Sequence, residues 1–181
     1  MAGVWTNNWR AFRNIMLMAS HHNGLSTFTK PDGTTAADKY NDELMATSPL
    51  GTYSNDEGSS NAENTIKIGT GNTAPAATDY NLASRANVNY LTCTFSNPTY
   101  NDQTGVLTRT ITLSVQNQSG GSITIREWGI FGHVRTAIYY GSSYAEALLY
   151  REVLDSPVVL ANYQTATIQV TVSLTLSDPV A

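Results

Sequence analysis

The segment that most constrains the fold is the end of the chain, Thr165 to Ser177, where apolar and polar residues alternate almost without error. Successive side chains of a β-strand point to opposite faces, so this pattern predicts one long strand with a buried face and a wet face. The apolar positions are Ala166, Ile168, Val170, Val172, Leu174 and Leu176, and the polar ones are Thr165, Thr167, Gln169, Thr171, Ser173 and Thr175. Because the wet face is neutral, it suits a scaffold that packs against other chains.

Shorter upstream segments also indicate strands, separated by turn sequences rich in Gly, Asn, Ser and Pro. They cover 66–68, 87–96, 106–116, 123–131, 148–154 and 158–160, with Gly132 ending the fourth and Asp155-Ser156-Pro157 separating the last two. Short strands with regular turn signals are typical of an antiparallel sandwich or barrel. The sequence therefore predicts a mainly β protein in which residues 65–181 form an antiparallel β-sandwich or barrel.

The N-terminal region has a different period. Trp5, Trp9, Phe12 and Met16 follow one another at intervals of four, three and four residues, which predicts an amphipathic helix within an N-terminal arm, 1–24. These side chains are interface candidates, and two interpretations stay open. The helix packs on its own β-domain, or it docks on a neighbouring subunit.

Residues 25–64 show no sustained period and contain several turn signals, among them Pro31-Asp32-Gly33. A loop of this length inside a compact domain is unusual and is often functional. We expect a long irregular loop that protrudes or contacts another chain.

Composition narrows the classes of function. Charged residues make up 13% of the chain, against an average of about 25%. The net charge is −4 and the ten Lys and Arg residues are scattered, so direct binding to nucleic acid is not expected. No apolar run approaches the roughly 20 residues that span a bilayer, and we expect neither a membrane segment nor a signal peptide.

The low charge also bears on association. Soluble monomers usually keep apart through surface charge, so a surface of Thr, Ser, Asn, Tyr and Gly indicates one that partners cover. The alternative is an ordinary acidic β-domain with a polar surface. The single cysteine, Cys93, excludes an internal disulfide and favours folding in a reducing cytoplasm.

Three segments carry a resemblance to tailed-bacteriophage virion proteins. They are Ile68-Gly69-Thr70-Gly71-Asn72-Thr73-Ala74-Pro75 followed by Asp79 and Leu82, then Glu127-Trp128-Gly129-Ile130-Phe131-Gly132, then Leu148-Leu149-Tyr150-Arg151-Glu152-Val153-Leu154 with Pro157. The resemblance covers about residues 66–176 and implies a component of the phage particle on a β-sandwich scaffold. Trp128 departs from it, standing where the family more often has a smaller aliphatic residue, and so does a long insert at 135–147.

The charged residues within these segments have a physical interpretation of their own. Glu127 and Arg151 interrupt apolar strands, and a buried carboxylate needs a partner. We expect a structural ion pair between Glu127 and either Arg151 or Arg126. Glu127 as a general base is the weaker alternative, because no second acid or His stands at a suggestive spacing.

No other residues indicate catalysis, a cofactor or a metal. His21 and His22 are adjacent and far from His133, so they do not make a ligand set. Gly69 and Gly71 lack the third glycine of a dinucleotide-binding loop. Tyr139, Tyr140 and Tyr144 surround a Gly-Ser-Ser sequence and make the best recognition loop, for a neighbouring subunit or a glycan, with a simple exposed hairpin as the alternative.

Three functions are compatible with these observations. The first and favoured one is a non-enzymatic virion structural protein, made in the bacterial cytoplasm, that assembles with itself and with other virion proteins. A position in the tail, neck or baseplate is preferred to capsid decoration. The second is a fibre or baseplate module that binds a host receptor or glycan, and the third is a β-sandwich enzyme, for which the sequence offers no catalytic set.

Overall fold

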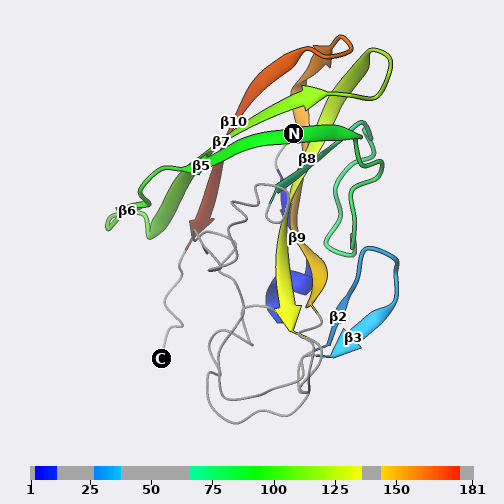
Figure 1. Ribbon diagram of the computed structural model, residues 1–181. Helices are drawn as coiled ribbons and strands as arrows, with labels where there is room; N and C mark the ends of the chain where they lie inside the picture. The colour runs from blue at the N-terminus through cyan, green and yellow to red at the C-terminus, as the bar shows by residue number, and fades with distance from the viewer. Residues whose placement is uncertain (1–2, 12–26, 38–65, 136–143, 176–181) are drawn as a thin grey trace, which may run out of the picture.

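The computed structural model describes residues 3–11, 27–37, 66–135 and 144–175, and these residues are mainly β (Figure 1). The strands are β1 (Val4–Trp5), β2 (Thr27–Thr29), β3 (Thr35–Ala37), β4 (Ile66–Gly69), β5 (Val88–Phe95), β6 (Thr99–Asn101), β7 (Val106–Asn117), β8 (Ile123–Arg135), β9 (Tyr144–Leu160) and β10 (Thr165–Thr175). All their pairings are antiparallel. The antiparallel β class is therefore confirmed.

The described strands form three open sheets and do not close into a barrel. One sheet has the order β1-β9-β8-β4, a second has the order β10-β7-β5 with β6 also paired to β7, and β2 and β3 make a hairpin. In Figure 1 the β10-β7-β5 sheet crosses the upper part of the β8–β9 pair, which continues beyond it toward the β2–β3 hairpin.

The main core draws on both larger sheets. Ile68, Trp128 and Ile130 from one sheet belong to the same buried cluster as Leu113 and Val170 from the other. Trp128 is among the largest buried side chains, at 1% exposure. Burial of apolar surface between the sheets stabilises the fold at roughly 25 cal/mol per Å². A smaller cluster of Phe28, Ala147 and Leu149 lies under the β2–β3 hairpin.

The alternation predicted for the two most regular strands is confirmed. In β7, Ile111, Leu113 and Val115 are buried, and in β10 Ile168 and Val170 are buried. From 108 to 116 in β7 and from 165 to 175 in β10, the outward positions carry Thr, Ser and Gln and no charged residue. The Leu176 position lies outside the described residues.

Two strand boundaries differ from the prediction. β9 is one continuous strand from Tyr144 to Leu160, where a break at 155–157 was expected. The register with β8 shifts between Ile125 and Glu127, so the Pro157 segment is accommodated in an irregularity instead of ending the strand. β8 also continues through Gly132 to Arg135, because residues of the expected insert pair with it.

The N-terminal prediction is wrong for Trp5. This residue lies in β1 and pairs with Tyr150 of β9, and helical backbone occurs at residues 7–11. Phe12 and Met16 lie outside the described residues. The expected irregular loop contains the β2–β3 hairpin, turning at Pro31-Asp32-Gly33, and its remainder from 38 to 64 lies outside the described residues.

Candidate functional site

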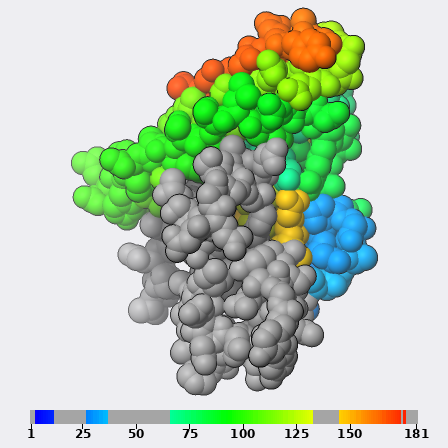
Figure 2. All heavy atoms as spheres, in the orientation of Figure 1, coloured from blue at the N-terminus to red at the C-terminus, as the bar shows by residue number. Residues whose placement is uncertain are grey.

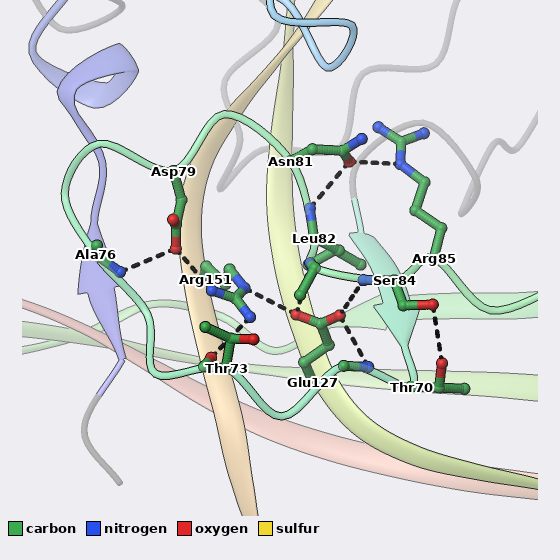
Figure 3. Close-up of polar contacts among 12 residues, drawn as sticks. Thr70, Thr73, Ala76, Asp79, Asn81, Leu82, Ser84, Arg85, Glu127 and Arg151 are labelled. Atoms are coloured by element: carbon green, nitrogen blue, oxygen red, sulfur yellow. Dashed lines mark hydrogen bonds and ion pairs between the residues drawn. The ribbon is translucent and has the colours of Figure 1, made fainter.

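The most elaborate polar arrangement is built around Glu127, on the face of β8 away from the main core. Its side chain has 0% exposure, and it accepts four hydrogen bonds (Figure 3). Oε1 accepts the backbone N–H groups of Gly71 at 3.1 Å and Ser84 at 2.8 Å. Oε2 accepts the N–H of Ala83 at 3.1 Å and Nε of Arg151 at 2.8 Å. Every hydrogen bond of the carboxylate is thus directed to the protein itself.

Arg151, on the neighbouring strand β9, extends the arrangement. Its Nη1 donates to Oδ2 of Asp79 at 2.7 Å, and its Nη2 donates to the carbonyl oxygen of Thr73 at 2.9 Å. Burial alone would lower the pKa of Arg151, but the hydrogen bonds and charges of Asp79 and Glu127 outweigh it and raise that pKa. A guanidinium that remains charged and holds two carboxylates makes a strong, directional connection between strand and loop.

These contacts fix the segment 70–85, which we call the clamped loop. Asp79 also accepts the N–H of Ala76 at 2.9 Å, which closes a turn inside the loop. The N-terminal arm adds a bond from the N–H of Asn7 to the carbonyl of Ala77 at 2.7 Å. Figure 3 shows the loop curving around the Glu127–Arg151 pair from both sides. The loop therefore has a defined course without being part of a sheet.

Glycine is required where the clamped loop starts. A β-carbon on Gly69 would lie 2.4 Å from the backbone oxygen of Ser84, and one on Gly71 would lie 2.5 Å from Oε1 of Glu127. The carboxylate can accept the Gly71 N–H only because no side chain separates them.

A second set of charges holds the end of the clamped loop. Arg85 Nη2 lies 3.1 Å from Glu146 Oε2, and Lys67 Nζ lies 2.8 Å from Oε1 of the same carboxylate. Both cations also lie over the ring of Phe131, at 4.6 Å for Arg85 and 5.9 Å for Lys67. Burial alone would raise the pKa of Glu146, but Lys67 and Arg85 outweigh it and lower that pKa.

The segments 68–82, 127–132 and 148–157 meet at this site. The first contributes Gly69, Gly71 and Asp79, the second contributes Glu127, and the third contributes Arg151. Leu82, also from the first, packs with Phe131 and Leu148 beside the ion pair. Asp79 belongs to the first of these segments, but the sequence did not predict it as a partner of Arg151.

Of the two cations considered for Glu127, Arg151 is the one in contact. Arg126 precedes Glu127 in β8, and its buried Nε has no hydrogen-bond partner among the described residues.

The expected interface candidates are placed differently. Trp5 packs against the main core, with ring centroids 4.6 Å from Trp9 and 5.0 Å from Tyr150, and Trp9 packs against the smaller cluster. Both tryptophans therefore make contacts within the chain, and a part in a subunit interface stays a prediction. Tyr139 and Tyr140 lie outside the described residues, as does the side chain of Tyr144, whose backbone begins β9.

Other chemistry is sparse in the described parts of the chain. Within them, no group of three or more His, Cys, Asp and Glu side chains is arranged to hold a metal ion. His21 and His22 lie outside these parts, and the side chain of His133 does too. Among the described residues there is no helix that is long and apolar enough to cross a membrane.

Comparison with known proteins found no relative of this chain. No protein family, curated protein or solved structure matches the chain.

Proposed function

We propose that this chain is a non-enzymatic structural protein of a bacteriophage virion, which works by assembling with copies of itself and with other virion proteins. The observation that carries the proposal is the convergence at one buried cluster of the three segments that resemble virion proteins. Segments up to 78 residues apart in sequence serve one structural purpose there. This supports a shared architecture better than three unrelated coincidences would.

The chemistry of the cluster favours a structural role over catalysis. A general base needs an oxygen free to take a proton from substrate. Both oxygens of Glu127 are engaged by the protein, and the side chain has 0% exposure. The cluster holds a loop in place, which is what a particle component with a fixed outer surface needs.

The surface of the β10-β7-β5 sheet supports assembly. Its outward residues in β7 and β10 are neutral and polar, so copies can approach without charge repulsion. We further infer that the two larger sheets are the layers of a β-sandwich, since their inner faces share one core cluster. We place the protein in the tail, neck or baseplate, with capsid decoration as the alternative position.

Two experiments test this function. The first is the native mass of the purified chain, measured by light scattering over a wide concentration range, where we expect multiples of 19.6 kDa. The second is mass spectrometry of purified phage particles from the producing cells, with antibody labelling under the electron microscope to locate the protein. A chain that stays monomeric and is missing from particles would refute the proposal. Label confined to the capsid surface would move it to the decoration role.

A further inference from the structure

β10 is an edge strand of unusual regularity. It pairs with β7 over its full length, Thr165 to Thr175, with no shift of register. No described strand pairs with its other side, and it runs along a margin of the molecule (Figures 1 and 2). An edge of this kind presents a row of backbone N–H and C=O groups that can pair with another strand.

The devices that usually protect such an edge are missing from β10. Its eleven residues, TATIQVTVSLT, include no charged residue, no proline and no glycine. Natural proteins normally place a charge, a proline or a bulge on an exposed edge to prevent pairing with other chains. β10 has none of them.

The outer strands β5 and β4 of the two larger sheets each carry such a device. On the opposite side of the same sheet, β5 has a bulge between Tyr90 and Thr92, and Pro98 separates β5 from β6. Arg109 Nε donates to the carbonyl of Ser96 at that same edge, at 2.8 Å. In the other sheet, β4 is only four residues long and carries the charged Lys67. β1 covers part of β9.

The sequence of β10 is also self-complementary when two copies of the strand pair antiparallel. In an antiparallel pair centred on Val170, Ile168 would face Val172 and Gln169 would face Thr171. The apolar row of one copy then continues the apolar row of the other, and the neutral polar rows likewise meet. Because no residue is charged, two identical strands approach without repulsion.

We infer that the edge of β10 pairs with β10 of a second copy, antiparallel across a two-fold axis, and joins two β10-β7-β5 sheets into one. The inference names the surface for the self-assembly proposed above and rests on that function for its setting. A two-fold contact of this kind closes on itself, so it makes a dimer as the building unit of a larger assembly.

The test places charge at the centre of the expected contact. Gln169→Lys and Thr171→Lys together alter two exposed side chains, so the fold is retained, which circular dichroism checks. The four added charges would face one another across the axis, and we expect the dimer dissociation constant to rise on the order of 100-fold. The matched control is Thr92→Lys with Thr94→Lys, two exposed threonines on the protected edge of the same sheet, which should leave the dimer unchanged.

A charge-reversal experiment gives an independent result. A variant with Gln169→Glu and Thr171→Glu should also be monomeric alone, and mixing it with the lysine variant should restore a dimer containing one of each. A wild-type dimer that survives the lysine substitutions, or variants that do not pair when mixed, would overturn the β10 contact and leave assembly through another surface standing. A wild-type chain that is monomeric at every concentration would overturn the assembly function as well.

Discussion

Gly71 and Glu127 occupy one small space: a β-carbon on Gly71 would lie 2.5 Å from the Oε1 atom that accepts the Gly71 N–H at 3.1 Å. The carboxylate can be fully enclosed because the residue in front of it has no side chain. The glycine and the buried charge are therefore one structural device, although 56 positions separate them in the sequence.

Replacing Gly71 by Ala should force the Glu127 side chain or the loop to move. We expect the free energy of unfolding to fall by about 1–3 kcal/mol, the usual cost of overpacking. Urea unfolding followed by tryptophan fluorescence measures it. Gly121→Ala is the control, because nothing lies within 4 Å of a β-carbon there. Equal stability of the two variants would contradict the crowding argument.

Glu127→Gln keeps the shape of the side chain and removes its charge. Each carboxylate oxygen accepts two N–H donors, so the amide nitrogen would face donors in either orientation. We expect a loss of about 3–5 kcal/mol, the range found when one partner of a buried ion pair is removed. Hydrogen exchange should show residues 71–84 losing protection first.

The control for this variant is Asp32→Asn, in the exposed pair that Lys30 makes at 3.5 Å. Exposed pairs contribute about 0–1 kcal/mol, so little change is expected. If the two substitutions cost the same, the Glu127 cluster does not organise the clamped loop.

Trp5→Ala separates the two roles considered for the N-terminal aromatic residues. Trp5 contacts Trp9 and Tyr150 and packs on the main core, so its loss should lower stability by on the order of 3 kcal/mol. The oligomer mass should not change while the chain remains folded. Thermal unfolding and light scattering give the two readouts. A variant with wild-type stability that no longer assembles would return Trp5 to a subunit interface.

Asn117→Asp should introduce a pH-dependent instability. Asn117 is fully buried, and its Nδ2 donates to the carbonyl oxygens of Gly121 at 2.7 Å and Leu160 at 2.9 Å. A carboxylate there would face two acceptors, and we expect a loss of at least about 3 kcal/mol at neutral pH.

Burial beside acceptors should raise the pKa of the introduced carboxyl above its unfolded value of about 3.9. The unfolded state then binds fewer protons, so the variant loses stability relative to wild type as pH rises from about 4. Chemical unfolding at a series of pH values measures the difference. A difference independent of pH would exclude an ionised group at this position.

Cys93 should react slowly in the folded protein. Burial raises the pKa of its thiol to about 11 from 9.0. At pH 8 the thiolate fraction is then about 100-fold lower than for an ordinary thiol, and alkylation by iodoacetamide should slow at least in proportion. The protein in urea is the control.

The same shift gives a pH dependence of stability. The contribution of the neutral thiol is complete below pH 9 and is lost as pH rises toward 11, because the unfolded state ionises first. Comparison of wild type with Cys93→Ser over this range isolates the effect. Parallel stability curves for the two proteins would show that Cys93 is not shielded.

The strands that sequence reasoning located best are those whose pattern is local. β7 and β10 have a period of two because one face is buried and the other wet, and that information is contained within each strand. β9 was divided because Pro157 usually ends a strand, and only the register with β8 shows how the irregularity accommodates it. The spacing between Trp5 and Trp9 is also compatible with a helix, and only the pairing of Trp5 with Tyr150 shows that Trp5 belongs to β1.

Part of the candidate site could be predicted from the sequence for a similar reason. A charge in an apolar strand needs a partner, which led to the Glu127 pair. The choice of Arg151 depends on register, because Gly129 faces Arg151 and so brings it diagonally beside Glu127 on one face. The clamped loop could not be anticipated, since nothing in residues 70–85 tells which sheet face they cover.

The way the clamped loop is held has a consequence for variation. The contacts that hold this loop involve its backbone groups and a few inward-pointing side chains. The side chains of Asn72, Ala74 and Thr78, in contrast, are exposed to solvent. Substitutions at these three positions should leave the path of the chain intact. A lineage can therefore diversify this patch under selection, and a protein engineer can graft a short epitope there, without redesigning the framework beneath.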